Sequence, residues 1–286
     1  MKTYLDCIPC FISQSLEASR MATSDENIQL KVLREVMKYL QNLSFEGSPP
    51  ETSREVHYII KSITHSKDPY RHVKEQANKV ARDLFPYLKK IVKNSKDPLL
   101  MAVKLAITGN VIDFGTMNRF NVEEMIDAVV KGEEIDQWSY KKFVKKIGNV
   151  ENVLYIADNT GEIFFDKLLL EELKEKKLTY VVKANPIIND ATVEDAKFAG
   201  IDKIAEVIPG DIGDGKSAPG MLLKHASKEF IECFNSADAV IAKGQGNYEA
   251  LSDVDREVFF LLVAKCPLVA QDLETNVGKL ILKVNK

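Results

Sequence analysis

The fold is decided by one stretch of sequence, Val153-Leu154-Tyr155-Ile156-Ala157-Asp158-Asn159-Thr160-Gly161-Glu162. Its first five residues are apolar, and a short apolar run bounded by turn residues is typical of a strand buried on both faces. The polar residues that follow are those of a turn and of a helix start. A buried strand that leads into a helix predicts a parallel sheet covered by helices.

The same alternation continues toward the C-terminus. Further short apolar runs occupy residues 180–182, 204–208, 239–242 and 268–270, and stretches of helical character occupy residues 163–177, 191–199, 218–234 and 253–265. We therefore predict an α/β fold for residues 149–286, in which a Rossmann-like parallel sheet is sandwiched by helices.

An all-helical domain is predicted for residues 1–148. Apolar residues recur there every three or four positions, as at Val73, Ala77, Val80 and Leu84. The pair Asp97-Pro98 has the form of a helix cap followed by proline in the first turn. The sequence thus predicts a helical domain that precedes the α/β domain.

Composition excludes several classes of protein. The 286 residues carry a formal net charge of −3, with 39 basic and 42 acidic residues, so no positive field favours nucleic acid or an anionic membrane surface. No apolar run approaches the length of a membrane span, and the N-terminus lacks the order of a signal peptide. Four cysteines are too few for a disulfide scaffold of this size. We expect a cytoplasmic protein, of an oligomeric state that the sequence leaves open.

Polar residues gather where ligands bind in a doubly wound sheet, just beyond the carboxyl ends of the strands. Three predicted strands are followed by Asp158, Asn159 and Glu162, by Lys183, Asn185 and Asp190, and by Lys243, Gly244 and Asn247. Carboxylate and amide oxygens suit Mg²⁺ or Mn²⁺, and lysines beside such an ion suit a phosphate. Taken singly, most of these residues also fit helix caps, tight turns or solvated strand ends.

These blocks, in this order, resemble the domain-of-unknown-function-89 family. That family comprises damage-control phosphatases related to acidic-residue methyltransferase-like proteins. The resemblance is to its prokaryotic branch, which has an N-terminal Cys-x-x-Cys, here Cys7-Ile8-Pro9-Cys10. It also includes the block Gly109-Asn110-Val111-Ile112-Asp113. It implies a helical N-terminal part, a Rossmann-like C-terminal part, and hydrolysis of phosphorylated sugars or damaged phosphometabolites.

The resemblance also implies roles for individual residues. It implies one divalent cation on Asp158, Asn159 and Asp190, and a phosphate contact at Lys243. We expect the cation to be Mg²⁺, Mn²⁺, Co²⁺ or Ni²⁺ and the partner to be a small phosphorylated metabolite. Further candidate substrate contacts, or residues that support the ligands, are Glu162, Lys183, Asn185, Gly244, Asn247, Asn110 and Asp113.

A nucleotide-binding loop is the strongest alternative, because Gly210-Asp211-Ile212-Gly213-Asp214-Gly215-Lys216-Ser217 matches the pattern G-x-x-x-x-G-K-[ST]. Asp211 and Asp214 would repel phosphate, and Pro219-Gly220 falls where the required helix should begin. We expect this loop to form a wall over the pocket instead.

Other functions stay open. A phosphatase with an aspartyl nucleophile would want a second Asp two residues after the first, where this chain has Thr160. Direct attack by metal-activated water is the simpler hypothesis. Carboxyl methylation and non-catalytic binding of a metal or nucleotide are further alternatives.

Cys7 and Cys10 share a face of a predicted helix. Because no second close pair exists, a zinc site would need Cys233, Cys266 or a distant histidine. We expect the pair to serve packing or to make an auxiliary metal contact.

Overall fold

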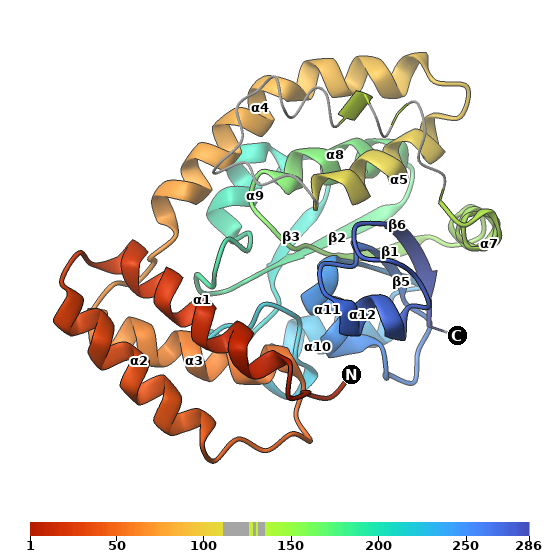
Figure 1. Ribbon diagram of the computed structural model, residues 1–286. Helices are drawn as coiled ribbons and strands as arrows, with labels where there is room; N and C mark the ends of the chain where they lie inside the picture. The colour runs from red at the N-terminus through yellow and green to blue at the C-terminus, as the bar shows by residue number, and fades with distance from the viewer. Residues whose placement is uncertain (111–125, 128–129, 131–134, 286) are drawn as a thin grey trace.

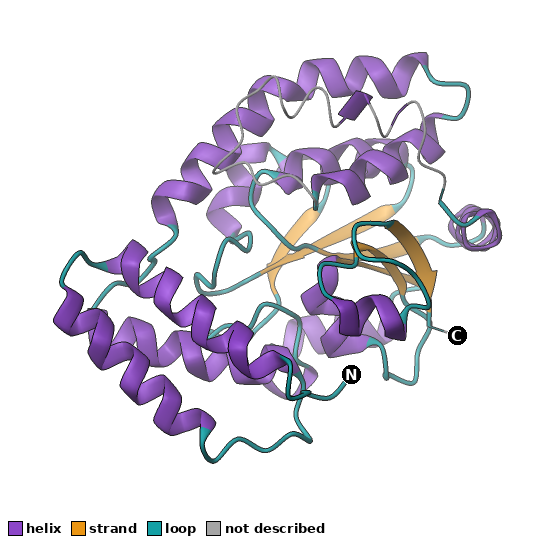
Figure 2. Ribbon diagram, in the orientation of Figure 1, coloured by secondary structure: helices purple, strands orange, loops and turns teal. Residues whose placement is uncertain are grey.

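The computed structural model describes residues 1–110, 126–127, 130 and 135–285, and it is shown in Figures 1 and 2. Asp113 lies outside the described residues. The described residues of the first half form helices and the loops that join them, as predicted. Its helices are α1 (Cys7–Ala22), α2 (Glu26–Leu40), α3 (Pro49–Thr64), α4 (Arg71–Asn94), α5 (Pro98–Gly109) and α7 (Gln137–Gly148).

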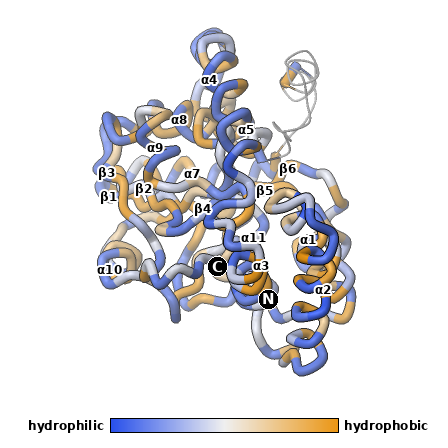
Figure 3. Tube along the Cα trace, turned by 90° about the vertical axis from the view of Figure 1, so that its left-hand side faces the viewer, coloured by the Kyte–Doolittle hydropathy of each residue, from blue (hydrophilic) through white to orange (hydrophobic). Residues whose placement is uncertain are grey.

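Helices α1, α2 and α3 pack on one another around their own apolar cluster, which contains Phe11, Val32, Val36, Val56 and Ile60. In Figure 1 they form the red to orange group beside the sheet domain. Figure 3 shows hydrophilic and hydrophobic segments alternating along α1 and α2, as expected of helices buried on one side.

A mixed, mostly parallel sheet forms the second half. Its strands are β1 (Asn152–Ile156), β2 (Lys177–Val182), β3 (Glu206–Pro209), β4 (Ala239–Lys243), β5 (Phe259–Val263) and β6 (Leu280–Val284), in the spatial order β3-β2-β1-β4-β5-β6. Strands β1 to β5 pair in parallel, and β6 pairs antiparallel with β5. The chain moves outward from β1 to β3 and then returns to the other side of β1. This reversal places a crevice between the carboxyl ends of β1 and β4.

Helices cover both faces of the sheet. Helices α4, α5 and α7 share a buried cluster with α8 (Glu162–Glu172), α9 (Val193–Ala199) and one face of the strands. The other face packs against α10 (Lys228–Ser236), α11 (Gly244–Leu251) and α12 (Pro267–Asp272). Along β1, Val153 and Tyr155 belong to the first cluster, whereas Leu154 and Ile156 belong to the second. This alternation explains why the run is apolar at every position. The division of the chain at residue 148 stays a prediction.

Two predicted elements near the C-terminus were wrong. Residues 253–265 do not form a helix, because Phe259–Val263 is the fifth strand. Residues 268–270 lie in α12, which begins at Pro267. All five residues of β5 are fully buried, and a short apolar run has no periodicity that separates a strand from a helix. Proline at the first helical position favoured a helix after Cys266.

Two further differences concern the parts beside the sheet. Residues 218–234 form a loop, a 3₁₀ turn (Leu223–His225) and α10 instead of one helix. The antiparallel strand β6 was not predicted. No helix in the described part of the chain has both the length and the apolar character that a bilayer span requires.

Candidate active site

The three predicted metal ligands come together through backbone pairing. Asp158 and Asn159 follow β1, and Asp190 ends the loop that follows β2. Asn159 and Asp190 form an antiparallel bridge, and the N–H of Ala191 donates to the carbonyl of Asp158 at 2.8 Å. The two strand ends are therefore joined by hydrogen bonds, which fixes the three side chains at one edge of the sheet.

The loop before Asp190 contains a strained residue. Ile188 has φ 42°, a left-handed conformation that is rare for a β-branched side chain. Its side chain packs against the apolar cluster of α1 to α3. Such strain persists only where the surroundings enforce it, and it is concentrated at functional sites.

The charge state of the two carboxyl groups suits a divalent cation. Burial, together with the nearby Glu162, raises the pKa of Asp158 to about 6. Burial raises the pKa of Asp190 well above its ordinary value, although Lys183, with Nζ 3.6 Å from Oδ2 of Asp190, opposes the shift. Among the described residues, Oδ2 of Asp190 has no hydrogen-bond partner. Two buried carboxyl groups with an orphaned oxygen fit a cation that would neutralise them.

Amide side chains complete this arrangement. Nδ2 of Asn159 donates to Asp158 at 2.7 Å and to Glu162 at 3.0 Å, which leaves Oδ1 of Asn159 available as a ligand. Within the described residues, no three histidine, cysteine or acidic side chains form a metal site by themselves. The predicted set therefore depends on Asn159 as its third ligand.

Asn110 brings the helical half of the chain into the site. It follows the last residue of α5, and its Nδ2 donates to Asp158 at 2.6 Å and to Glu162 at 3.1 Å. Its Oδ1 has no hydrogen-bond partner in the described part of the chain. Asn110 thus lies beside Asp158 and Glu162, and its predicted role in the site stays a prediction.

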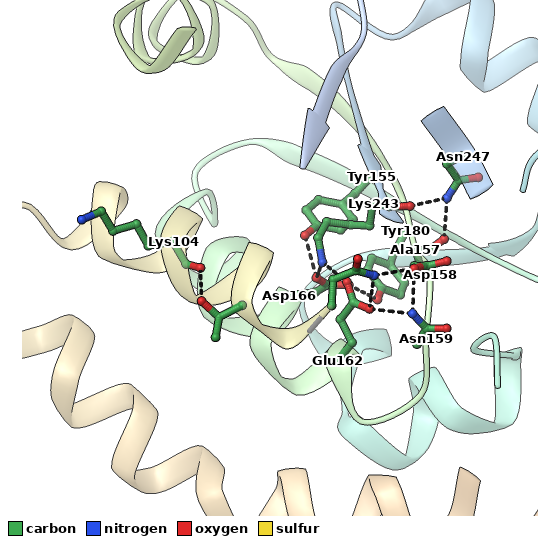
Figure 4. Close-up of polar contacts among 12 residues, drawn as sticks. Lys104, Tyr155, Ala157, Asp158, Asn159, Glu162, Asp166, Tyr180, Lys243 and Asn247 are labelled. Carbon is green, nitrogen blue, oxygen red and sulfur yellow. Dashed lines mark hydrogen bonds and ion pairs between the residues drawn. The ribbon is translucent and has the colours of Figure 1, made fainter. Parts of the chain in front are cut away.

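Lys243 lies beneath the carboxylates and away from the cavity. Its side chain is fully buried, and its ammonium group contacts Glu162 and donates to Asp166 at 2.7 Å. Figure 4 shows Lys243, Glu162 and Asp166 pointing toward one another. The sequence predicted neither this geometry nor Asp166.

The residues after β4 support the strand ends. Gly244 has φ +80°, and a Cβ at this position would overlap the carboxylate of Asp158. Nδ2 of Asn247 donates to the carbonyls of Ala157 at 3.0 Å and Lys243 at 2.7 Å, while its Oδ1 accepts from the N–H of Met221. The side chain of Asn247 is thus engaged in holding the β1 and β4 ends together.

A cavity of about 390 Å³ is lined by Asp158, Asn159 and Asp190, the three predicted ligands. Its other walls come from α1, α3, α11 and the start of α12, and include Cys7, Cys10 and Cys266. Lys183 lies next to Asp190 but does not line the cavity. Asn185 faces a separate hollow beside Lys61 and Gly215.

Gln245, Glu249 and Lys265 also line the cavity, and the sequence predicts no individual role for any of them. Lys265 stands just beyond the carboxyl end of β5, where the sequence predicts a helix over residues 253–265 and therefore no strand end. Its ammonium group has no ion-pair partner among the described residues and favours ionisation of Asp158. Burial raises the pKa of Glu249 to about 7, although Gln245 donates to it at 2.8 Å.

The loop at residues 210–217 does not have the geometry of a nucleotide-binding loop. It follows β3, but residues 216–227 contain no α-helix. Lys216 pairs with Glu55 at 2.9 Å, and Arg54 pairs with Asp214 at 2.5 Å. These contacts attach the loop to α3, and Ser217 donates to Asp211 inside it.

Comparison with known proteins gives one consistent result. The family described as "Damage-control phosphatase ARMT1-like domain" matches residues 3–281. The chain belongs to the damage-control phosphatase family.

Relatives of similar length support the assignment to the damage-control phosphatase family. A protein named "Damage-control phosphatase" from Archaeoglobus fulgidus is 37% identical, over 97% of each chain. A second protein with that name, from Pyrococcus horikoshii, is 37% identical over 100% of this chain and 99% of its own. An uncharacterized protein of Methanocaldococcus jannaschii is 39% identical over 97% of this chain and 93% of its own.

A solved structure shows that the similarity holds for the fold over the full length of the chain. The crystal structure of a DUF89 family protein from Pyrococcus horikoshii matches with a TM-score of 0.91 and 35% identity, over 100% of both chains. Both the predicted family and the α/β fold are confirmed.

Proposed function

We propose that this protein is a divalent-metal-dependent phosphatase that hydrolyses phosphate monoesters of small metabolites, such as sugar phosphates or damaged phosphometabolites. Membership in the damage-control phosphatase family supports hydrolysis of phosphate esters. The metal dependence is inferred from one observation: Asp158, Asn159 and Asp190 lie together on the wall of a cavity large enough for such a metabolite.

Asp158, Asn159 and Asp190 would hold one cation through oxygen atoms, which suits Mg²⁺, Mn²⁺, Co²⁺ or Ni²⁺. When bound, such a cation supplies Lewis-acid chemistry, by polarising a phosphoryl oxygen and lowering the pKa of a water molecule.

The other groups on the wall have separable tasks. Lys265 is the exposed cation of the cavity, so we assign to it the contact with the phosphate that the sequence assigned to Lys243. Lys183 lies beside Asp190 and offsets its negative charge. Glu249, with a pKa of about 7, is suited to donate or accept a proton near neutral pH.

The decisive experiment is phosphate release from a panel of sugar phosphates and nucleotides by chelator-treated protein. Each of the four cations is then added back singly. We expect turnover only with cation, and no turnover by the Asp190→Ala variant. Full activity in excess chelator would contradict the metal mechanism. Saturable ATP hydrolysis that depends on Lys216 would support an NTPase, and methyl transfer from S-adenosylmethionine to carboxylates would support a methyltransferase.

A further inference from the structure

A buried network of charges and hydroxyls lies directly behind the proposed metal ligands. Glu162 and Asp166 are four residues apart on α8, so they share one face of the helix. The ammonium group of Lys243 lies between their carboxylates. All three side chains are fully buried, and Figure 4 shows them converging from α8 and β4.

Two tyrosines fix the far side of this network. The hydroxyl of Tyr155, on β1, donates to Oδ1 of Asp166 at 2.8 Å. The hydroxyl of Tyr180, on β2, donates to Oδ2 of Asp166 at 2.8 Å. The two rings are stacked with centroids 5.4 Å apart. Asp166 is therefore held by three donors, one of them the ammonium group of Lys243.

Glu162 connects this network to the proposed ligands. Its Oε1 contacts Lys243, while its Oε2 accepts from Nδ2 of Asn110 at 3.1 Å and of Asn159 at 3.0 Å. Both amides also donate to Oδ2 of Asp158. The orientation of Glu162 therefore fixes which way the amide of Asn159 faces and where the carboxylate of Asp158 points.

We propose that Asp166 and Lys243 are positioning residues, which act through Glu162 to aim Asn159 and Asp158 at the cation without touching the substrate. This inference rests on the proposed metal site. Neither residue lines the cavity, and neither has exposed surface, so a substrate in the cavity meets Asp158 and Lys265 instead.

The contacts of Glu162 support the same assignment. The ammonium group of Lys243 occupies its Oε1, so its Oε2 is left to accept from both asparagine amides. Each amide therefore presents its N–H toward Glu162 and its oxygen elsewhere.

The test compares Asp166→Asn with the parent protein. The substitution keeps the size of the side chain but removes one of the two carboxylate charges on α8 that Lys243 contacts. Metal affinity is measured by titration with Mn²⁺, followed by electron paramagnetic resonance, and kcat and KM are measured on the same preparations. We expect a weaker Mn²⁺ affinity, with the loss of about 10-fold to 100-fold that follows removal of a direct partner of a metal ligand as its upper limit.

A charge-neutral variant separates positioning from charge. Replacing Tyr155 and Tyr180 together by Phe removes two hydrogen-bond donors to Asp166 without changing any charge. We expect this variant, like Asp166→Asn, to bind Mn²⁺ more weakly than the parent protein. The matched control is Tyr140→Phe. Tyr140 is also buried and also donates to a carboxylate, that of Asp97 at 3.0 Å, but it lies on α7. We expect this control to keep the parental affinity.

A second measurement needs no metal. The side-chain amide signals of Asn110 and Asn159, observed by NMR and assigned by replacing each asparagine in turn, should shift in both network variants and not in Tyr140→Phe. If the parent protein binds no Mn²⁺, the proposed function fails, while the amide signals still decide the positioning. Unchanged amide signals in folded network variants, or a lowered melting temperature with parental Mn²⁺ affinity, would overturn the inference.

Discussion

Asn110 donates a hydrogen bond of 2.6 Å to the carboxylate of Asp158, which connects the end of α5 to the end of β1. The contact is possible because α5 lies very close to α8. A Cβ on Gly109 would lie only 3.0 Å from the side chain of Phe165. The helical half of the chain therefore contributes directly to the candidate site.

Gly244→Ala should abolish turnover, because the added methyl group would displace the carboxylate of Asp158. The matched control is Gly278→Ala. Gly278 also has a positive φ, of 88°, but a Cβ there would meet nothing within 4 Å. Both variants should lose stability, by about 1 kcal/mol for the backbone conformation alone. Kinetics and thermal melts of the two proteins test this, and equal kinetics would contradict the assignment.

Asp190→Ala should remove metal binding and turnover while leaving the metal-free fold intact, since its buried carboxyl group has few partners to lose. Asp195→Ala is the contrast, because Asp195 completes the capping box of α9 and pairs with Lys74. We expect that variant to lose about 1 kcal/mol of stability and to keep its metal affinity. Calorimetry of metal binding and of unfolding distinguishes the two, and an unfolded Asp190→Ala protein would favour a purely structural role.

Metal affinity should rise as the pH rises through about 6, because Asp158 and Asp190, which both have raised pKa values, must lose their protons to bind the cation. Asp158 has a pKa of about 6 in the folded protein against 3.8 ordinarily. Because its folded pKa is raised, its contribution to metal-free stability is complete at low pH and is lost as the pH rises through about 6. Because the cation binds the ionised carboxylate, the affinity for the cation increases over that same pH interval. Titrations between pH 5 and 8 measure the effect. In the Glu249→Gln variant, the increase in metal affinity near pH 6 should persist. If that variant lacks the increase, Glu249 is the titrating group.

Lys265→Ala should lower kcat/KM for phosphate esters by about 10²-fold, by analogy with removing one charge-stabilising group from an active site. Lys216→Ala should have little effect, since its pair with Glu55 is partly exposed and such pairs contribute about 0 to 1 kcal/mol. Steady-state kinetics of both variants show which of the two lysines matters for hydrolysis. A reversed ranking would restore the nucleotide-binding interpretation of residues 210–217.

Replacing Cys7 and Cys10 together by Ser should leave the dependence of turnover on the divalent cation unchanged, because thiolates are soft ligands and the proposed cation is hard. Both residues line the cavity, together with Cys266, so KM can change through the shape of the wall. Metal-titrated kinetics and a thermal melt measure the two effects separately. Loss of a stoichiometric metal together with turnover would place the pair among the ligands.

Much of the candidate site could be predicted because the proposed ligands follow strands directly in sequence. Asp158 and Asn159 come after β1, Asp190 ends the loop after β2, and a parallel sheet brings such ends to one edge. The sequence could not predict the surroundings of Lys243. Its partner Glu162 lies 81 residues away, and no local pattern encodes such a contact.

By itself, the sequence determined the family, the α/β fold with a helical first half, and the polar strand ends where the cation is proposed to bind. These features depend on local order, which periodicity and motifs reveal. Only the tertiary structure decided that residues 259–263 form a strand, that Lys265 and Cys266 therefore reach the cavity, and that Lys243 lies behind it. The physical reason is that a short, fully buried apolar run is compatible with a strand or a helix. Its contacts with residues distant in sequence therefore determine which of the two forms.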